Sequence, residues 1–393
     1  MVTDDRVYHE CMQLTSQFKF CPNAFRVDMY RGCDFGCKYC FANMEAFHET
    51  GTGLSVWREA DINNVKRKFE LAFDTDKESK SVIVELLRHR VPLHCGGMSD
   101  PFQSRERELK LTKQLIEISN AYDYPICFST KASYFPGNTN EYEKLLNPKI
   151  HAFQISIMGY HQEYIKEWET NTTSIMHPNS VVSRAEFVQY LRDLGFWCSV
   201  RIQPIIDITE AMRLMYYLES TPSYYSIEHI HVISDSYGAQ RALDTYIEKM
   251  GIRDLFVRNG GVTEFRYDIK KRHAEKLIQI ANRFGVKVGV ADNDLHHMSQ
   301  SRCCCGIDTI GGAFDNYLKY NSCYLSTGES DIDNIWIPKS NVRRHMNMGK
   351  QLPEVYVEDV VKRYIHNNPE LIPDEYRENV ERHLFGSYSP RLF

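Results

Sequence analysis

Long apolar runs are missing from this sequence. No uninterrupted stretch approaches the roughly 18 residues that a membrane-spanning helix needs. Met1–Phe20 also lacks a basic segment followed by an apolar one, so we expect no secretion leader and a cytoplasmic protein. An excess of one charge is missing too, because 47 Lys and Arg stand against 52 Asp and Glu. A net charge of -5 does not favour duplex DNA as a partner, and we expect no membrane partner.

Internal repeats and low-complexity segments are also absent, and the 42% apolar and 25% charged residues are typical of a globular protein. Cysteine is the exception, with 12 residues. Thiols in a cytoplasmic chain stay reduced, so clustered cysteines indicate metal ligands or catalytic groups more than disulfides.

Short β-rich runs alternate with amphipathic helical stretches along most of the chain. The expected strands are Phe25–Arg31, Val91–Cys95, Pro125–Lys131, Ala152–Met158, Trp197–Ile206, Ile227–Ser234 and Val286–Ala291. The expected helices are Ser79–His89, Glu106–Asn120, Ser183–Leu194, Glu210–Glu219 and Lys270–Phe284. This alternation predicts an α/β fold, a partial or full (β/α) TIM-type barrel of about six or seven parallel strands. A doubly wound open sheet is the alternative.

Four regions are expected along the chain. They are an N-terminal extension (1–24), a barrel core (25–235), the final barrel units with a Cys-rich segment (236–337) and a helical C-terminal cap (338–393). In a barrel of this kind the chemistry lies on loops that follow the carboxyl ends of the strands.

Three cysteines, Cys33, Cys37 and Cys40, follow the first expected strand with C-x3-C-x2-C spacing. Gly32 and Gly36 allow the backbone to curl so that the thiolates converge. Three thiolates can hold three irons of a [4Fe–4S] cluster and leave the fourth iron open, whereas a closed structural site needs a fourth ligand nearby. A zinc knuckle or reduced core thiols are the alternatives.

This loop resembles the signature of the radical S-adenosylmethionine superfamily, in which S-adenosylmethionine binds the open iron. Further blocks are similar to the spore photoproduct lyase-like branch and cover about half the chain. They are the segment from Gly96 to Gln103, Ser129-Thr130-Lys131, Ile155-Ser156-Ile157, Ser183-Arg184 and the segment from Val200 to Ile206.

The resemblance implies a cofactor site for S-adenosylmethionine at the strand ends. Its expected residues are Tyr39, Phe41, Gly96, Gly97, Ser129, Lys131, Ser156 and Arg201. An aromatic of the loop would lie near the adenine, and the glycines would let the backbone approach the methionine amine. Lys131 or Arg201 would neutralise the carboxylate, and a serine would hydrogen-bond the carboxylate or a ribose hydroxyl. Asp100 is expected to cap the following helix, and a place at the mouth of the barrel is the alternative.

A second group of thiols, Cys303, Cys304 and Cys305, follows the last expected strand, and Cys323 lies further on. Cys303, Cys305 and Cys323 could hold an auxiliary Fe–S centre. Alternatively, one of the three adjacent thiols could donate a hydrogen atom to a substrate radical, or all could be packing groups.

Cys95 is a further candidate for catalysis. In spore photoproduct lyase a cysteine that quenches the product radical stands where this chain has Gly97, and Cys95 lies two residues earlier. This departure argues against photoproduct repair as the activity.

The sequence therefore predicts an enzyme that cleaves S-adenosylmethionine reductively to a 5′-deoxyadenosyl radical, which abstracts hydrogen from a substrate. The substrate could be a small molecule, a nucleotide or a peptide, and the reaction could be that of a lyase, an oxidoreductase or a transferase. The resemblance implies an electron donor such as flavodoxin or ferredoxin. The alternatives are an auxiliary-cluster modifier of a peptide or natural product, and a non-catalytic Fe–S binding or sensing protein.

Overall fold

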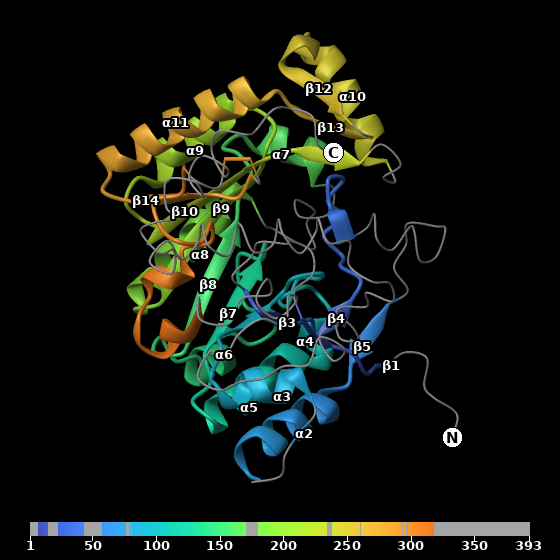
Figure 1. Cartoon of the computed structure of the whole chain (residues 1–393), viewed down its shortest axis with the longest axis vertical. Coiled ribbons are helices and arrows are strands. Elements are labelled where there is room, and N and C mark those ends of the chain that lie inside the picture. The colour runs from blue at the N-terminus through green and yellow to red at the C-terminus, as the bar shows by residue number, and fades with distance from the viewer. Residues whose placement is uncertain are drawn as a thin grey trace, which may run out of the picture.

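A curved, mostly parallel β-sheet forms the centre of the molecule in the computed structural model (Figure 1). The structure describes residues 7–14, 23–42, 57–75, 79, 81–169, 180–233, 238–259, 261–292, 294–295 and 298–317. The strands of the main sheet, in spatial order, are β14 (Lys287–Val290), β10 (Tyr224–His229), β9 (Trp197–Ile205), β8 (His151–Ser156), β7 (Ile126–Thr130), β6 (Leu93–Cys95), β3 (Phe25–Val27) and β2 (Met12–Leu14).

The main sheet is a partial barrel. Its first seven strands in this order are parallel, and β2 pairs antiparallel with β3 at one edge. Within the described residues, β14 and β2 are edges that do not pair with each other, so the barrel is open. The structure thus confirms the predicted α/β fold, in its partial form and with seven parallel strands.

Two small sheets flank the main one. The first consists of β1 (Val7–Tyr8), β5 (Arg58–Ala60) and β4 (Tyr30–Arg31), and the second of β11 (His231–Ile233), β13 (Val262–Phe265) and β12 (Phe256–Asn259). Two of the expected strands are therefore divided, because Phe25–Arg31 contributes β3 and β4, and Ile227–Ser234 contributes the end of β10 and then β11.

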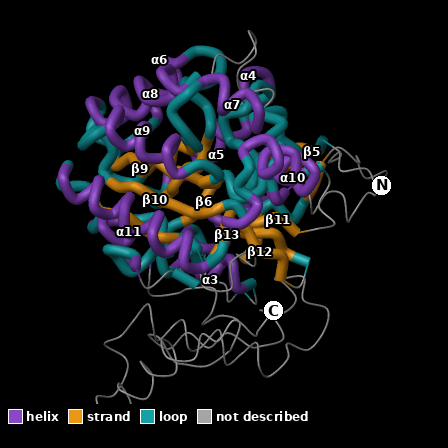
Figure 2. Tube along the Cα trace, turned by 90° about the horizontal axis from the view of Figure 1, so that it is seen from above, coloured by secondary structure: helices purple, strands orange, loops and turns teal. Residues whose placement is uncertain are grey.

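Helices surround the outside of the curved sheet (Figure 2). They are α2 (Ile62–Phe73), α3 (Val82–Arg88), α4 (Glu106–Leu109), α5 (Leu111–Ala121), α6 (Thr139–Leu145), α7 (Gln162–Trp168), α8 (Val181–Asp193), α9 (Ile208–Leu218), α10 (Ala239–Met250) and α11 (Tyr267–Arg283). Helix α9 shows why they form: the Asp207 side chain caps its N-terminus, and the apolar residues of its buried face recur at helical spacing. No helix among the described residues is long and apolar enough to span a bilayer.

The two faces of the sheet differ in chemistry because side chains alternate along a strand. The convex face packs against the helices through buried apolar side chains: Phe128, Phe153, Ile155, Val200, Ile202 and Ile227. The concave face carries the residues between them: Ser129, Gln154, Arg201, Gln203 and Ser226. The apolar core therefore lies between the sheet and the helices, and the hollow of the partial barrel is polar.

Residues 301–317, which we call the floor segment, lie across the amino ends of the parallel strands. The segment includes the 3-10 helices η3 (Ile307–Thr309) and η4 (Gly312–Tyr317). It packs against side chains near the first residues of four strands, Cys127, Ala152, Trp197 and Tyr224. At one end the Cys304 backbone lies so close to β14 that a Cβ on Gly289 would come within 2.2 Å of its carbonyl oxygen. At the other end Asn316 donates a hydrogen bond to the His89 carbonyl just after α3, at 2.9 Å.

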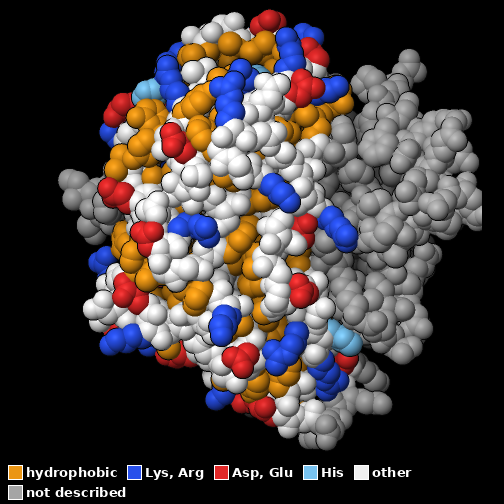
Figure 3. Space-filling view, turned by 90° about the vertical axis from the view of Figure 1, so that its left-hand side faces the viewer, with side chains coloured by type: hydrophobic (Ala, Val, Ile, Leu, Met, Phe, Trp, Pro, Cys, Tyr) orange, Lys and Arg blue, Asp and Glu red, His pale blue; other side chains and the backbone are white. Residues whose placement is uncertain are grey.

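Charges of both signs are mixed on the molecular surface. On the face shown in Figure 3, Lys and Arg side chains are scattered among Asp and Glu, and no continuous basic strip crosses the described residues there. The proposed cap at 338–393 and Cys323 lie outside the described residues.

The first prediction concerns a buried carboxylate behind the cysteine loop. Glu106 accepts hydrogen bonds from the hydroxyls of Tyr30 and Tyr142 and from the Thr112 backbone N–H. Because Glu106→Ala leaves these buried donors without a partner, we expect it to lower the free energy of unfolding by about 2–5 kcal/mol. Urea denaturation measures this loss. The exposed neighbour Glu108→Ala should change it by about 0.5 kcal/mol or less, and equal effects of the two substitutions would contradict the assignment.

The second prediction is a pH dependence at the carboxyl ends of β10 and β14. The backbone N–H of His229 lies 3.1 Å from the Asp292 carboxylate and its Nδ1 lies 2.7 Å from it. Burial raises the pKa of Asp292, but the contacts with His229 and the nearby Lys270 outweigh burial and hold this pKa below its usual value. The pair therefore stabilises the fold above the unfolded-state pKa, and the stabilisation is lost as the pH falls through the folded-state pKa.

Asp292→Asn should accordingly lower the free energy of unfolding by about 1–3 kcal/mol at pH 7. The difference in the free energy of unfolding between the variant and the parent should become smaller as the pH is lowered into the acid range. Urea denaturation across that range provides the measurement, and a gap that stays constant at all pH values would contradict this account.

Candidate functional site

The cysteine loop leaves the small sheet at β4 and returns toward the strand ends of the main sheet. Gly32 and Gly36 both have positive φ, 92° and 62°, which L side chains rarely adopt, so the expected curl of this loop is present. Cys37 is buried, and Cys33 and Cys40 are half-buried.

Two distant segments hold the loop. The Lys38 backbone N–H donates to the Trp168 carbonyl at 2.8 Å, and Cys37 forms an isolated β-bridge with Glu169. On the other side, the side chain of Gln103 donates to the Gly32 carbonyl at 3.2 Å. The position of the thiols is therefore set by the end of α7 and by the loop after β6.

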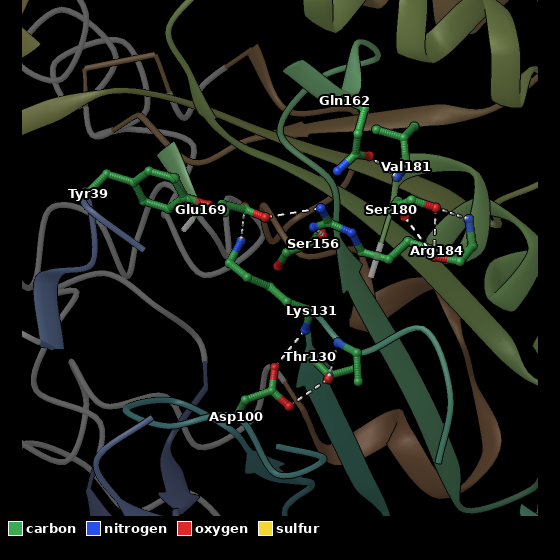
Figure 4. A network of polar contacts seen from close by, with 12 residues as sticks. Tyr39, Asp100, Thr130, Lys131, Ser156, Gln162, Glu169, Ser180, Val181 and Arg184 are labelled. Atoms are coloured by element: carbon green, nitrogen blue, oxygen red, sulfur yellow. Dashed lines mark hydrogen bonds and ion pairs between the residues drawn. The ribbon is translucent and has the colours of Figure 1, made fainter. Parts of the chain in front are cut away.

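Glu169 is the centre of a buried charge network (Figure 4). Its carboxylate is fully buried and lies 3.0 Å from the Lys131 ammonium and 3.0 Å from the Arg184 guanidinium. It also accepts a hydrogen bond from the Tyr39 hydroxyl. Burial alone would raise the pKa of Glu169, but Arg184 and Lys131 lower it to about 2, so the group is a carboxylate at neutral pH.

This network connects the cysteine loop to the edge of the parallel sheet. Tyr39 lies within the loop, Lys131 directly follows β7, and Arg184 lies on α8. Arg184 also donates to the Ser156 carbonyl at the end of β8, at 2.7 Å. The Lys131 ammonium lies 5.2 Å from the centre of the Tyr39 ring, so the cation faces the aromatic as well as the carboxylate.

Asp100 has a different role from the one predicted. It caps no helix, since α4 begins after Arg105 without a side-chain cap. Its carboxylate instead accepts from the Thr130 hydroxyl at 2.7 Å and from the Lys131 backbone N–H at 2.6 Å. The prediction was wrong because the chain turns between Asp100 and the helix, which carries the side chain to the end of β7. Burial raises the pKa of Asp100 to about 6.

The three thiols suit an iron–sulfur cluster by their chemistry. The ten cysteines that the structure describes are outside any disulfide, so Cys33, Cys37 and Cys40 are present as thiols. In the described part of the chain, no three Cys, His, Asp or Glu side chains lie close enough together to hold a single metal ion. A cluster binds each thiolate at a different iron, so its ligands stand farther apart than those of one ion. Burial raises the pKa of Cys33 and of Cys37, and coordination by iron is what would favour their thiolate forms.

Close backbone packing accounts for the two adjacent glycines after β6. A Cβ on Gly96 would lie 2.4 Å from the Ser129 carbonyl oxygen, and one on Gly97 would lie 2.7 Å from Cδ of Arg26. Gly96 also has a φ of 100°. Both positions therefore need glycine for the packing of β3, β6 and β7 alone, before any ligand is considered.

A chain of hydrogen bonds crosses the concave face of the sheet from β6 to β10. Nε2 of His94 lies 2.7 Å from Oγ of Ser129, which accepts from Arg201 at 3.3 Å. Arg201 also donates to Gln203 at 2.5 Å, and Gln203 donates to the Ser226 hydroxyl at 2.8 Å. Burial and the cations Arg201 and Arg26 lower the pKa of His94 to about 3, so its ring is neutral at pH 7.

The remaining predicted residues lie in several places. Ser156 is half-buried at the end of β8, and Phe41 is 36% exposed at the end of the loop. Cys95 is fully buried in the apolar core. It follows His94, which faces the hollow, so Cys95 points to the convex side and away from Ser129.

The second cysteine group lies in the floor segment, at the amino ends of the strands. Sγ of Cys303 lies 3.3 Å from Sγ of Cys305 and donates to the Asp308 carboxylate at 2.8 Å. The described residues contain no group of three or more Cys, His, Asp or Glu side chains that could hold a single metal ion here. Cys323, the third expected ligand of the auxiliary centre, lies outside the described residues, so that centre stays a prediction. The two cysteine groups therefore lie at opposite ends of the parallel strands.

Glu169 is the residue of this candidate site that sequence reasoning missed. It lies at the end of a polar stretch with no recognisable spacing, and its partners are 15, 38 and 130 residues away along the chain. Arg184 could be noted from the Ser183-Arg184 block, but its contact with Glu169 had no signal in the sequence.

Comparison with known proteins gives no matching family model and no matching curated protein. Several solved structures are similar. One is spore photoproduct lyase complexed with a dinucleoside spore photoproduct. Its alignment covers 71% of this chain and 77% of the lyase chain, with 15% sequence identity and a TM-score of 0.46. The radical S-adenosylmethionine methyltransferase TsrM from Kitasatospora setae, bound to tryptophan and a cofactor analogue, matches 75% of this chain and 60% of its own, with 9% identity and a TM-score of 0.43.

SuiB from Streptococcus suis, bound to its precursor peptide SuiA, matches 57% of this chain and 45% of its own, with 11% identity and a TM-score of 0.39. This chain thus spans less than two thirds of the SuiB and TsrM chains.

The third prediction concerns the charge network. Glu169→Gln removes the carboxylate that compensates two buried or half-buried cations, so we expect a loss of about 3–5 kcal/mol in the free energy of unfolding. Urea denaturation of the iron-free protein measures it without reference to activity. The matched control is Glu167→Gln, which breaks a surface ion pair with Lys249 and should cost about 1 kcal/mol or less. Unfolding of both variants at the same urea concentration as the parent would refute the proposed role of Glu169.

Proposed function

We propose that this chain is a radical S-adenosylmethionine enzyme that acts on a polar substrate held in the hollow of its partial barrel. Cys33, Cys37 and Cys40 would hold a [4Fe–4S] cluster. When bound, this cluster and S-adenosylmethionine would supply reductive cleavage of the sulfonium and a 5′-deoxyadenosyl radical that abstracts hydrogen from the substrate.

The observation that carries this proposal is the attachment of the three-thiol loop to the carboxyl ends of the parallel strands. Through Glu169, the loop is joined to Lys131 after β7 and to Arg184 beside the end of β8. Chemistry in α/β barrels takes place at this end of the strands. A purely structural metal knuckle would not require its loop to be fixed to a strand edge by a fully buried carboxylate.

Lys131 would neutralise the methionine carboxylate of the cofactor. Its ammonium has three N–H donors, and the ion pair with Glu169 occupies one of them, which orients the group and leaves others for a ligand. Ser156 and Ser129 would offer hydroxyls to the carboxylate or the ribose, and Tyr39 or Phe41 would lie against the adenine. Gly96 and Gly97 would let the backbone approach the amine.

Arg201 would meet either the cofactor carboxylate or an acidic group of the substrate. It is half-buried on the concave face, and its three hydrogen bonds go to the neutral acceptors Gln203 and Ser129. The carboxylate of Glu228 also interacts electrostatically with Arg201. An anionic group of a ligand in the hollow would form a stronger, charge-assisted hydrogen bond with Arg201 than these neutral acceptors do. The neutral ring of His94 contacts the same Ser129 hydroxyl as Arg201, and one of its nitrogens would accept a hydrogen bond from the substrate.

The proposed substrate is therefore a small molecule, a nucleotide or a peptide with polar groups. Photoproduct repair is not favoured, because Gly97 replaces the expected thiol and Cys95 points into the apolar core. An electron donor such as flavodoxin or ferredoxin would dock near the exposed Lys38. A reducing, cytoplasmic location would suit the ten described thiols, none of which is in a disulfide.

The fourth prediction tests the cluster and the activity together. Anaerobic reconstitution should load about four irons on the parent chain, and dithionite with S-adenosylmethionine should yield 5′-deoxyadenosine. Cys37→Ala should lose most of the iron and all 5′-deoxyadenosine, as measured by iron analysis, visible absorption and chromatography. Cys198→Ala, which removes a buried thiol on β9, is the control and should retain both.

Stoichiometric zinc in place of iron in an oxygen-free preparation would rule out the proposal. An intact cluster that never yields 5′-deoxyadenosine would instead favour the non-catalytic Fe–S binding protein.

A further inference from the structure

The floor segment holds two thiols in a geometry that the proposed radical chemistry does not use. Cys303 and Cys305 are separated by one residue, and their Sγ atoms are 3.3 Å apart. Cys303 is fully buried and Cys305 is half-buried. A disulfide needs a sulfur separation of about 2.05 Å, so a small rotation of the side chains would bring the sulfurs to bonding distance.

Each sulfur has a polar partner suited to a different step of thiol chemistry. Sγ of Cys303 donates its proton to Oδ1 of Asp308 at 2.8 Å. Sγ of Cys305 lies 3.0 Å from the Tyr317 hydroxyl, a donor that can stabilise a thiolate. Asp308 is itself fixed by the Arg302 backbone N–H at 2.9 Å. The buried thiol of Cys303 thus has a proton acceptor, and the half-buried Cys305 has a proton donor.

The backbone around this pair is closely packed. Gly306 has a φ of 74°, and a Cβ there would lie 2.4 Å from the Tyr224 ring. The Tyr224 hydroxyl in turn donates to the Cys303 carbonyl at 3.3 Å. The two thiols are therefore held together by the fold of the segment.

We propose that Cys303 and Cys305 form a thiol–disulfide exchange site, whose substrates are low-molecular-weight disulfides and which closes to an intramolecular disulfide. The half-buried Cys305 is the attacking thiol, Cys303 is the resolving thiol, and Asp308 accepts the proton of Cys303. Cys304 takes no part in the exchange.

The reaction balances in two steps. The Cys305 thiolate attacks a disulfide RSSR, which breaks the S–S bond, forms Cys305–S–S–R and releases RS⁻. Cys303 then passes its proton to Asp308 and attacks the Cys305 sulfur, which forms the Cys303–Cys305 bond and releases a second RS⁻. The two thiolates released take up the protons that the two cysteines lose. Overall the cysteine pair is oxidised by two electrons and RSSR is reduced to two RSH.

This site is separate from the proposed radical site. Cys127, which packs with the floor segment, is the second residue of β7, whereas Thr130, bound to Asp100, is the last. Three residues of strand span about 10 Å.

The fifth prediction tests this proposal on the full chain with its cluster reconstituted, under anaerobic conditions, with oxidised glutathione as the probe. After an acid quench and alkylation, trypsin should release residues 303–319, which contain these three cysteines and no others. We expect this peptide to lack two hydrogen atoms and to carry one alkyl group. Metal content and circular dichroism before and after oxidation show whether the cluster and the fold persist.

Four variants distinguish the roles. Cys304→Ser is the matched control and should form the disulfide at the parent rate. Cys303→Ser should stop with glutathione attached to Cys305, and Cys305→Ser should remain unmodified while folded. Asp308→Asn should slow closure roughly tenfold and let the mixed disulfide accumulate.

Three results would overturn the proposal. One is a disulfide that persists in Cys303→Ser, because it would pair Cys304 with Cys305. Another is oxidation of this peptide only after the chain unfolds. The third is a metal beyond the first cluster that is lost from Cys303→Ser. Since none of these readouts measures 5′-deoxyadenosine, failure here leaves the radical activity untouched, and failure of the radical activity leaves this test intact.

Discussion

The buried carboxylate of Glu169 is the contact on which the arrangement of the proposed radical site depends. It draws together Tyr39 from the cysteine loop, Lys131 from the end of β7 and Arg184 from α8, segments that lie far apart along the chain. The Asp100 carboxylate belongs to the same network through the Lys131 backbone N–H, so two carboxylates lie near two cations. The network that positions the loop therefore also orients the Lys131 ammonium, which we propose as the partner of the cofactor carboxylate.

Most of the fold could be predicted from the sequence because its elements are local and strongly patterned. All seven expected strands are represented in the sheets, and helices such as α8 and α9 lie within a few residues of the expected bounds. The hairpin of β12 and β13 was not predicted, because Gly260, Gly261 and several charged residues hide its alternating pattern. Its strands pair with each other and with β11, so their stability comes from a partner that the local sequence does not reveal.

The candidate site was predictable only in part, for a related reason. The three cysteines have a spacing of their own, and Lys131 lies in a short block that follows a clear strand. Glu169 and His94 belong to no such spacing or block, and their roles arise from contacts across the sheet. Asp100 shows the opposite error, because its local context favours a helix cap while the fold directs it to β7. A sequence pattern identifies structure that neighbouring residues encode. It does not identify charge networks between segments that are distant along the chain.

The polar hollow of the sheet has a consequence for how stability responds to temperature. Most barrels fill their interior with branched apolar side chains, but here serine, glutamine, histidine and arginine occupy much of that layer. Exposing polar surface on unfolding lowers the heat capacity of the unfolded state, whereas exposing apolar surface raises it. The heat-capacity increment per residue should therefore be small for a protein of this size. A small increment makes the curve of stability against temperature broad and shallow, so the fold would lose little of its stability on cooling.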